Sequence, residues 1–310
     1  MSTLPVATTA AGPVGSEHDG EVRGGRSGWS GRRPSPAWLG VVPFLAYVGV
    51  FLLLPTTIVV IGAFGDVDNR PTLENLRALS QDYVVRAFVN SVVVSATSAV
   101  LGAVLGALLA YLVVTGRPDG AVRRTVTSAS GVLAQFGGVT LAFAFIVTLG
   151  NQGLVTLLLE DNGVGVDSAW LYRVPGLVLV YTYFQIPLMV LVFLPALDGI
   201  RPQWREAATN LGGTTWDYWR HVGVPILTPP FLGATLLLFA NAFSAYATGA
   251  ALITQGGIIV PLQIRTALTS EVVLGQENVG KALALGMVVV VTVVMTLYAL
   301  LQRRTARWLR

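Results

Sequence analysis

Six long apolar segments follow one another along the chain, and shorter polar stretches separate them. Each segment has roughly 20 or more residues, which is the length that a helix needs to cross a hydrocarbon core of about 30 Å. The pattern therefore predicts six transmembrane helices, over residues 38–64, 87–114, 125–149, 175–197, 226–254 and 282–301. A further apolar stretch, 154–159, is too short to span and predicts a small helix at the outer face.

The composition supports this prediction. The chain has 310 residues, of which 53% are hydrophobic and 12% are charged, and ordinary soluble domains carry about twice that charged fraction. Residues 1–36 are rich in Gly, Ser, Pro and Arg and lack apolar periodicity, which is typical of a disordered tail. We therefore expect an all-α polytopic membrane domain over 37–310, because a helix satisfies its own backbone hydrogen bonds in lipid.

The positions of Lys and Arg predict the orientation. If the N-terminus lies in the cytosol, 14 of the 20 basic residues fall in inner segments, whereas Arg70, Arg77, Arg86, Arg173, Arg265 and Lys281 fall outside. Basic residues are enriched in cytoplasmic loops. We therefore expect both termini in the cytosol, with the chain crossing the membrane several times.

Several kinds of chemistry are excluded by what the chain lacks. It has no cysteine, and His18 and His221 are its two histidines, so neither a thiolate site nor a histidine metal cluster is expected. The predicted spans hold no Asp, Glu, Lys or Arg, and proton-driven carriers usually need such residues as relays. A secondary carrier or channel is thus a weaker alternative, and an intramembrane enzyme is weaker still.

Residues 275–282 nearly match the phosphate-binding loop GxxxxGK[ST]. Ala282 lacks the hydroxyl that would bind magnesium, no strand precedes the loop, and the predicted topology puts it outside the cell. We therefore expect no nucleotide, cofactor or metal on this chain.

The polar segment 199–225 lies between the fourth and fifth predicted spans. Good helix formers, including Glu206, Ala207 and Ala208, follow Pro202, and the pair 212–213 of glycines would end that helix. The segment therefore begins with one short helix and a turn on the predicted cytosolic side.

A second short helix follows the turn. Thr214 or Thr215 can cap its start, and Pro225 is expected to end it before the fifth span. The helix would place Trp216, Trp219 and Arg220 on one side, because the last two follow Trp216 by three and four residues. Periodicity alone leaves two interpretations open, an interfacial anchor or a docking surface for a soluble partner.

The spacing within this segment resembles the EAA loop of ABC importer permeases. That family's pattern is EAA-x3-G-x9-I-x-L-P, and the matching positions here are Glu206, Ala207, Ala208, Gly212, Val222, Val224 and Pro225. Valine replaces Ile and Leu, which keeps both positions apolar. The resemblance covers roughly residues 85–300 and implies the type I, MetI-like permease fold.

The resemblance also implies a mechanism and partners. The loop would dock into a groove on a dimer of separate ATPase subunits, which bind ATP and Mg, and it would pass their motion to the spans. A second, homologous permease would supply the other half of the path, and an extracytoplasmic binding protein would deliver a small solute. The resemblance implies a multi-pass protein in the lipid bilayer of a prokaryotic plasma membrane, with no nucleic acid involved. The expected coupling residues are Glu206, Ala207, Ala208, Gly212, Trp216, Arg220 and Pro225.

Flanking residues favour one branch of the family. The Leu-Gly pair at 211–212 and the stretch 239–257 resemble permeases for polyamines, phosphonates, iron and thiamine. Within that branch we favour a polyamine or 2-aminoethylphosphonate permease. A permease for sugars or other solutes is the alternative.

Polar residues within the predicted spans are candidates for the translocation path: Gln135, Tyr181, Tyr183, Gln185, Asn241, Ser244 and Tyr246. For each of them, an interhelical hydrogen bond that serves packing is the alternative. Gly102 and Gly106 form a GxxxG pair in the second span, which predicts close helix packing, within this subunit or at a subunit interface.

Overall fold

The computed structural model describes residues 41–65, 70–117, 120–165, 167–253, 258–269 and 276–306. Six of its helical segments are long and apolar enough to cross a membrane, which confirms the all-α, six-span prediction. The predicted tail 1–36 and the last residues, 307–310, lie outside the described residues.

Internal contacts divide the chain into two units, Met1–Phe51 and Leu52–Arg310. The first unit contains α1 (Val42–Val48), which leads into the π-helical turn Gly49–Leu53. The rings of Tyr47 and Phe51, one turn apart, are in contact at a tilt of 34°, with centroids 4.9 Å from each other. The first candidate span, Val42–Ala63, agrees with the predicted 38–64 to within a few residues.

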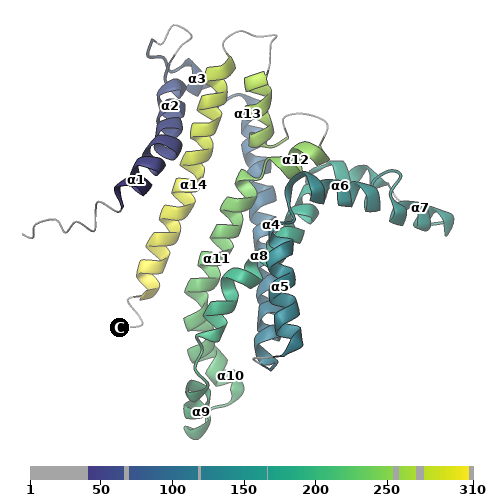
Figure 1. Cartoon of the computed structure of the whole chain (residues 1–310), viewed down its shortest axis with the longest axis vertical. Helices are drawn as coiled ribbons and strands as arrows, with labels where there is room; N and C mark the ends of the chain where they lie inside the picture. Colours follow the sequence, from purple (N-terminus) through teal and green to yellow (C-terminus); the bar gives the residue numbers. More distant parts are fainter. Residues whose placement is uncertain are drawn as a thin grey trace, which may run out of the picture. The chain divides into compact units, whose positions relative to one another are not determined.

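Three long helices form the centre of the second unit: α4 (Asp82–Thr115), α8 (Val174–Asp198) and α11 (Val224–Ser244) (Figure 1). Small residues let α4 and α8 approach closely. A Cβ placed on Gly102 would lie 2.5 Å from Cβ of Gln185, and one on Gly106 would lie 2.5 Å from Cβ of Met189. The GxxxG pair thus serves packing within this subunit.

The predicted third span, 125–149, is wrong in its bounds. Helix α5 (Ala121–Gln135) ends before a break at Gly137 and Gly138, and α6 (Gly138–Leu149) then runs in a different direction (Figure 1). Gly138 has φ +68°, a conformation that side chains disfavour, and Gly137 is extended. The third apolar candidate is instead Gly138–Asp161, and α5 is not among the six.

Two short elements follow α6. The predicted helix at 154–159 is present as α7 (Leu154–Asp161), and its leucines are exposed. A 3-10 turn, η3 (Ser168–Tyr172), then leads into α8.

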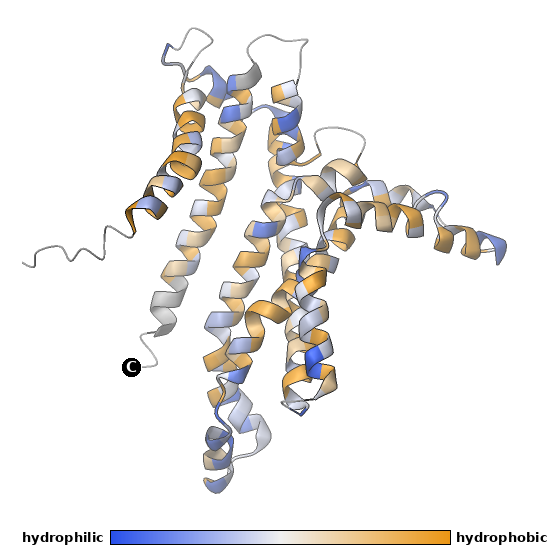
Figure 2. Cartoon of the chain, viewed as in Figure 1, coloured by the Kyte–Doolittle hydropathy of each residue, from blue (hydrophilic) through white to orange (hydrophobic). Residues whose placement is uncertain are grey.

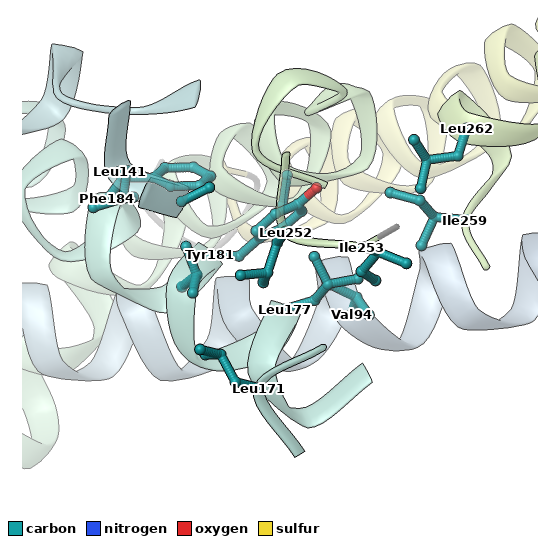
Figure 3. Close-up of a cluster of buried hydrophobic side chains, with 13 residues drawn as sticks. Val94, Leu141, Leu171, Leu177, Tyr181, Phe184, Leu252, Ile253, Ile259 and Leu262 are labelled. Atoms are coloured by element: carbon teal, nitrogen blue, oxygen red, sulfur yellow. The ribbon is translucent and has the colours of Figure 1, made fainter. Parts of the chain in front are cut away.

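The predicted fifth span, 226–254, is also interrupted. Helix α11 ends at Ser244, Ala245 is extended, and α12 (Ala247–Leu252) begins two residues later. The end of the predicted span, Thr254, lies outside the described residues. An apolar cluster surrounds Tyr181 of α8, and α4, α6, η3, α11 and the segments that follow α11 contribute further side chains to it (Figure 3).

Four further helices of this unit are α2 (Leu54–Ala63), α3 (Glu74–Ala78), α13 (Val260–Thr269) and α14 (Gln276–Ala306). Helix α14 packs on α2, where the stem of Lys281 crosses Gly62. Two side chains of α4 hold the start of α13: Asn90 donates to the carbonyl of Ile258 (3.1 Å), and the Ser91 hydroxyl accepts from the N–H of Val260 (2.9 Å).

Candidate coupling loop and translocation cavity

The helix that carries Glu206, Ala207 and Ala208 projects from one end of the central helices. This helix, α9 (Pro202–Asn210), has no buried residue, and Figure 2 shows it as a hydrophilic tip. A shallow hollow of about 330 Å³ lies along it, lined by Pro202, Arg205, Glu206, Thr209 and Asn210. The first part of the predicted loop is therefore a free polar surface.

Gly212 makes the turn after α9. Its φ of +79° is left-handed, and a glycine adopts this conformation without strain. The N–H of Gly212 donates to the carbonyl of Thr209, and that of Gly213 donates to Ala208, both at 2.9 Å. These two hydrogen bonds define a Schellman motif, which satisfies carbonyls at the end of the helix.

Thr214 begins the second short helix, α10 (Thr215–Tyr218). Its hydroxyl accepts from the N–H of Asp217 (3.2 Å), and the Asp217 carboxylate accepts from the N–H of Thr214 (2.9 Å). This reciprocal capping box fixes where the helix starts. The predicted helix–turn–helix is therefore present.

The prediction that Pro225 ends this helix is wrong. The chain stays helical from α10 through a π-helical turn, η4 (Trp219–Gly223), into α11, where Pro225 lies in the first turn. A proline has no N–H to donate and its ring crowds the carbonyl four residues earlier. The wider π-helical turn immediately before Pro225 removes that conflict without ending the helix.

The prediction that Trp216, Trp219 and Arg220 share one side is also wrong. Trp216 is 71% exposed and Arg220 is exposed, but the ring of Trp219 packs edge-on against Tyr111 of α4, with centroids 5.6 Å apart. The π-helical turn shifts the helical phase that the prediction assumed. Trp219 therefore joins the loop to the central helices, while Trp216 and Arg220 face outward.

An ion pair beside the loop was missed by the sequence analysis. Arg123, at the start of α5, binds the carboxylate of Asp198, the last residue of α8 before the loop. Both side chains are partly shielded from solvent. No local pattern could indicate the pair, because the partners belong to helices distant in sequence.

The breaks after α5 and α11 meet at a cavity of about 280 Å³. Three predicted path residues line it: Asn241, Ser244 and Tyr246. Gly137 and Gly138 contribute backbone, and Thr248 adds a further polar residue that the prediction did not include. Gln135 is exposed near the end of α5 but is not among the lining residues.

Tyr181 and Gln185 do not reach this cavity. Tyr181 is 1% exposed, and its hydroxyl donates to the carbonyl of Ala245 at the break (2.7 Å). Gln185 is fully buried, 3.1 Å from the Ser98 hydroxyl, and its amide nitrogen donates to the carbonyl of Leu238 (2.9 Å) in the orientation that satisfies both amide atoms. Both side chains make interhelical hydrogen bonds, which favours the packing alternative for them.

Tyr183 also has a packing role. It lies on the exposed side of α8, and its ring contacts Phe145 edge-on, with centroids 5.7 Å apart. Among the described residues, no group of three or more His, Asp or Glu side chains could hold a metal ion.

Membrane-spanning helices that carry a projecting helix–turn–helix with this spacing define the permease class of ABC importers. The chain belongs to the family of binding-protein-dependent transport system inner membrane components, whose model matches residues 102–309. It is therefore a multi-pass inner-membrane transport component and not an enzyme.

Curated relatives agree with this family. The chain is 24% identical over 266 residues to the sulfate transport system permease protein CysW of Synechococcus elongatus, covering 85% of this chain and 88% of the relative. It is 27% identical over 172 residues to CysT of Escherichia coli, covering 55% of this chain and 58% of the relative. It is 23% identical over 197 residues to the ferric transport system permease protein FbpB of Actinobacillus pleuropneumoniae, covering 63% of this chain but only 28% of the relative.

Solved structures show the same fold. A bacterial ABC transporter involved in the import of the acidic polysaccharide alginate has a chain that superimposes with a TM-score of 0.72 at 18% identity, covering 86% of this chain and 95% of that one. The MetNI methionine ABC transporter superimposes with a TM-score of 0.53 at 18% identity, covering 71% of this chain and 95% of that one. The predicted MetI-like fold is thus confirmed.

Proposed function

We propose that this chain forms half of the translocation path of an ATP-driven importer and that α9 and α10 couple it to a separate ATPase subunit. The observation that carries the proposal is the exposed helix α9 with its Schellman turn at Gly212, at the spacing that the family's coupling loop requires. The loop is exposed where a soluble partner can reach it, and Trp219 links it to α4.

The proposed topology places the α9–α10 end, and both chain termini, in the cytosol. Arg117, Arg123, Arg124, Arg201 and Arg205 all belong to segments at this end of α5 and α8, which supports the proposal. ATP and Mg would bind to the ATPase dimer, and this chain would bind neither. A homologous second permease and an extracytoplasmic binding protein would complete the importer.

For the cargo we propose a small oxyanion, a class that includes sulfate and phosphonates, and not a polyamine. The relatives named above carry sulfate and ferric transport names, and none of the three is named for polyamines. The cavity between α5 and α11 is lined by hydroxyl and amide groups without a carboxylate, which a polycation would need as a counter-charge.

Two substitutions in the loop test the coupling role. Glu206→Lys reverses the charge of the exposed α9 surface, and Gly212→Asp forces a side chain into the left-handed conformation, a strain of about 1–3 kcal/mol. Each variant should insert into the membrane normally but lose substrate-stimulated ATP hydrolysis in the assembled importer. Arg86→Ala, in an exposed ion pair with Asp82 at the opposite end of α4, is the control and should retain it. Normal stimulation in both loop variants would refute the docking role.

A further inference from the structure

Helix α5 has a polar row on its exposed side. Arg124, Ser128, Gly131 and Gln135 are all exposed and are spaced by four, three and four residues, so they lie on one face of the helix. The opposite face packs on α8, with Arg123 bound to Asp198 and Ser130 only 3% exposed. The polar row thus lies on the side of α5 that the rest of this chain leaves uncovered, beside the exposed Val122 and Val132.

This row has the wrong composition for contact with lipid. With 15 residues, α5 is about 22 Å long at 1.5 Å per residue, and it packs along α8, one of the six candidate spans of a bilayer core of about 30 Å. Polar and ionisable side chains within that core normally face a helix bundle or a water-filled cavity. In contrast, exposed residues of α14, such as Val289 and Val293, are apolar.

Two hollows contact α5, one along the helix and one near its end. A shallow groove of about 470 Å³ is lined by Arg124, Thr125, Ser128, Ala129 and Val132. Two residues after Val132, Ala134 lines the cavity that also contains Asn241, Ser244 and Tyr246. The groove begins near the α9–α10 end of the molecule, and the cavity lies at the break after α5 (Figure 1).

We propose that the exposed face of α5 lines the water-filled, cytosolic half of the path and that Arg124 makes this half selective for anions. The inference rests on the proposed function and deepens it. Neither hollow has an acidic side chain among its described lining residues. A guanidinium group followed by hydroxyl and amide donors suits an oxyanion, because these groups can donate hydrogen bonds to its oxygens.

The absence of cysteine from the chain allows a direct test. Single cysteines are introduced as Ser128→Cys and Gln135→Cys on the polar row, as Ser130→Cys on the packed face, and as Val289→Cys on α14. The assembled importer, in inside-out and right-side-out membrane vesicles, is treated with a membrane-impermeant thiosulfonate. Co-purification with the ATPase confirms that each variant has folded and assembled.

We expect modification at 128 and 135 and protection at 130 and 289. Protection of both 128 and 135 in the two vesicle types would overturn the proposal. Modification at 130 or 289 as fast as at 128 would overturn it too, because the polar row would then not be a distinct aqueous face.

Anion selectivity is tested with Ser128→Cys as the reporter, since it lies one turn from Arg124. Arg124→Gln should lower the ratio of the modification rates by an anionic and a cationic thiosulfonate by about ten-fold, the low end of electrostatic focusing effects. Arg124→Lys should preserve most of the ratio. Arg86→Gln should not change it, because Arg86 lies near the start of α4 whereas Arg124 follows the end of α4. An unchanged ratio in Arg124→Gln would overturn the selectivity. These outcomes are independent of the coupling test, because the ATPase can bind normally while the labelling pattern fails.

Discussion

Gly102 and Gly106 show how closely single residues determine the packing of this membrane protein. A Cβ on Gly106 would lie 2.5 Å from Met189 and 2.7 Å from the carbonyl of Ile186, so a larger side chain must push α4 and α8 apart. We expect Gly106→Val to destabilise the protein by about 1–3 kcal/mol, as overpacked cores do. Thermal unfolding in detergent measures this. Gly131→Val is the matched control, because no atom lies within 4 Å of its Cβ, and equal loss in both variants would contradict the packing account.

At Tyr181 a single hydroxyl stabilises the break between α11 and α12. It donates to the carbonyl of Ala245, which follows the end of α11 and so lies outside the regular hydrogen bonding of that helix. Tyr181→Phe keeps the buried ring and removes this hydrogen bond, and we expect a loss of about 0.6 kcal/mol and at most ~1.7 kcal/mol, the range for interhelical hydrogen bonds in membranes. Unfolding in detergent again provides the measurement. Tyr183→Phe, on the exposed side of α8, should cost less, and the reverse order would count against this role.

At the scale of elements, α10 and its π-helical turn divide two tryptophans between two tasks. Trp219 packs on Tyr111 and also covers Gly223, whereas Trp216 is 71% exposed. We expect Trp219→Ala to destabilise the protein, by less than the ~3–5 kcal/mol of a fully buried ring. Trp216→Ala should leave the midpoint of unfolding unchanged but weaken binding of the ATPase. Equal midpoints for the two variants would contradict this division.

The elements also show what the sequence could predict. The six spans could be predicted because a long apolar segment has few alternatives in a membrane, and the turn at Gly212 could be predicted because glycine suits a left-handed helix end. The break at Gly137 and Gly138 had a visible signal in its two glycines, but the apolar residues on either side of them predicted one continuous span. Pro225 predicted the end of a helix, whereas the preceding π-helical turn lets the helix continue through it. The contact of Trp219 with Tyr111 had no signal, because it joins segments distant in the chain.

The candidate path shows the same limit. Asn241, Ser244 and Tyr246 could be chosen as polar residues in an apolar span, and the structure brings them to one cavity. Their contact with cargo stays a prediction. In the sequence, Tyr181 and Gln185 are polar residues within an apolar span, as the three cavity residues are. Only the packing of α4, α8 and α11 shows that Tyr181 and Gln185 are buried.

At the scale of the whole molecule, an exposed loop and a polar face flank the packed central helices α4, α8 and α11. The loop is held to the central helices by Trp219 on Tyr111 and lies next to the Arg123–Asp198 ion pair. A push on α9 would therefore reach α4, α5 and α8, and α5 and α8 both contribute residues to the cavity. The central claim is that a separate ATPase docks on this loop.

The most direct test is purification of the tagged chain from its own cells in a mild detergent. We predict that an ATP-hydrolysing subunit and a second permease co-purify with the natural chain. With Gly212→Asp, the ATPase should be lost while the second permease is retained, because the substitution disturbs only the exposed turn. If no ATPase accompanies the natural chain, or if Gly212→Asp retains it in full, the account is contradicted.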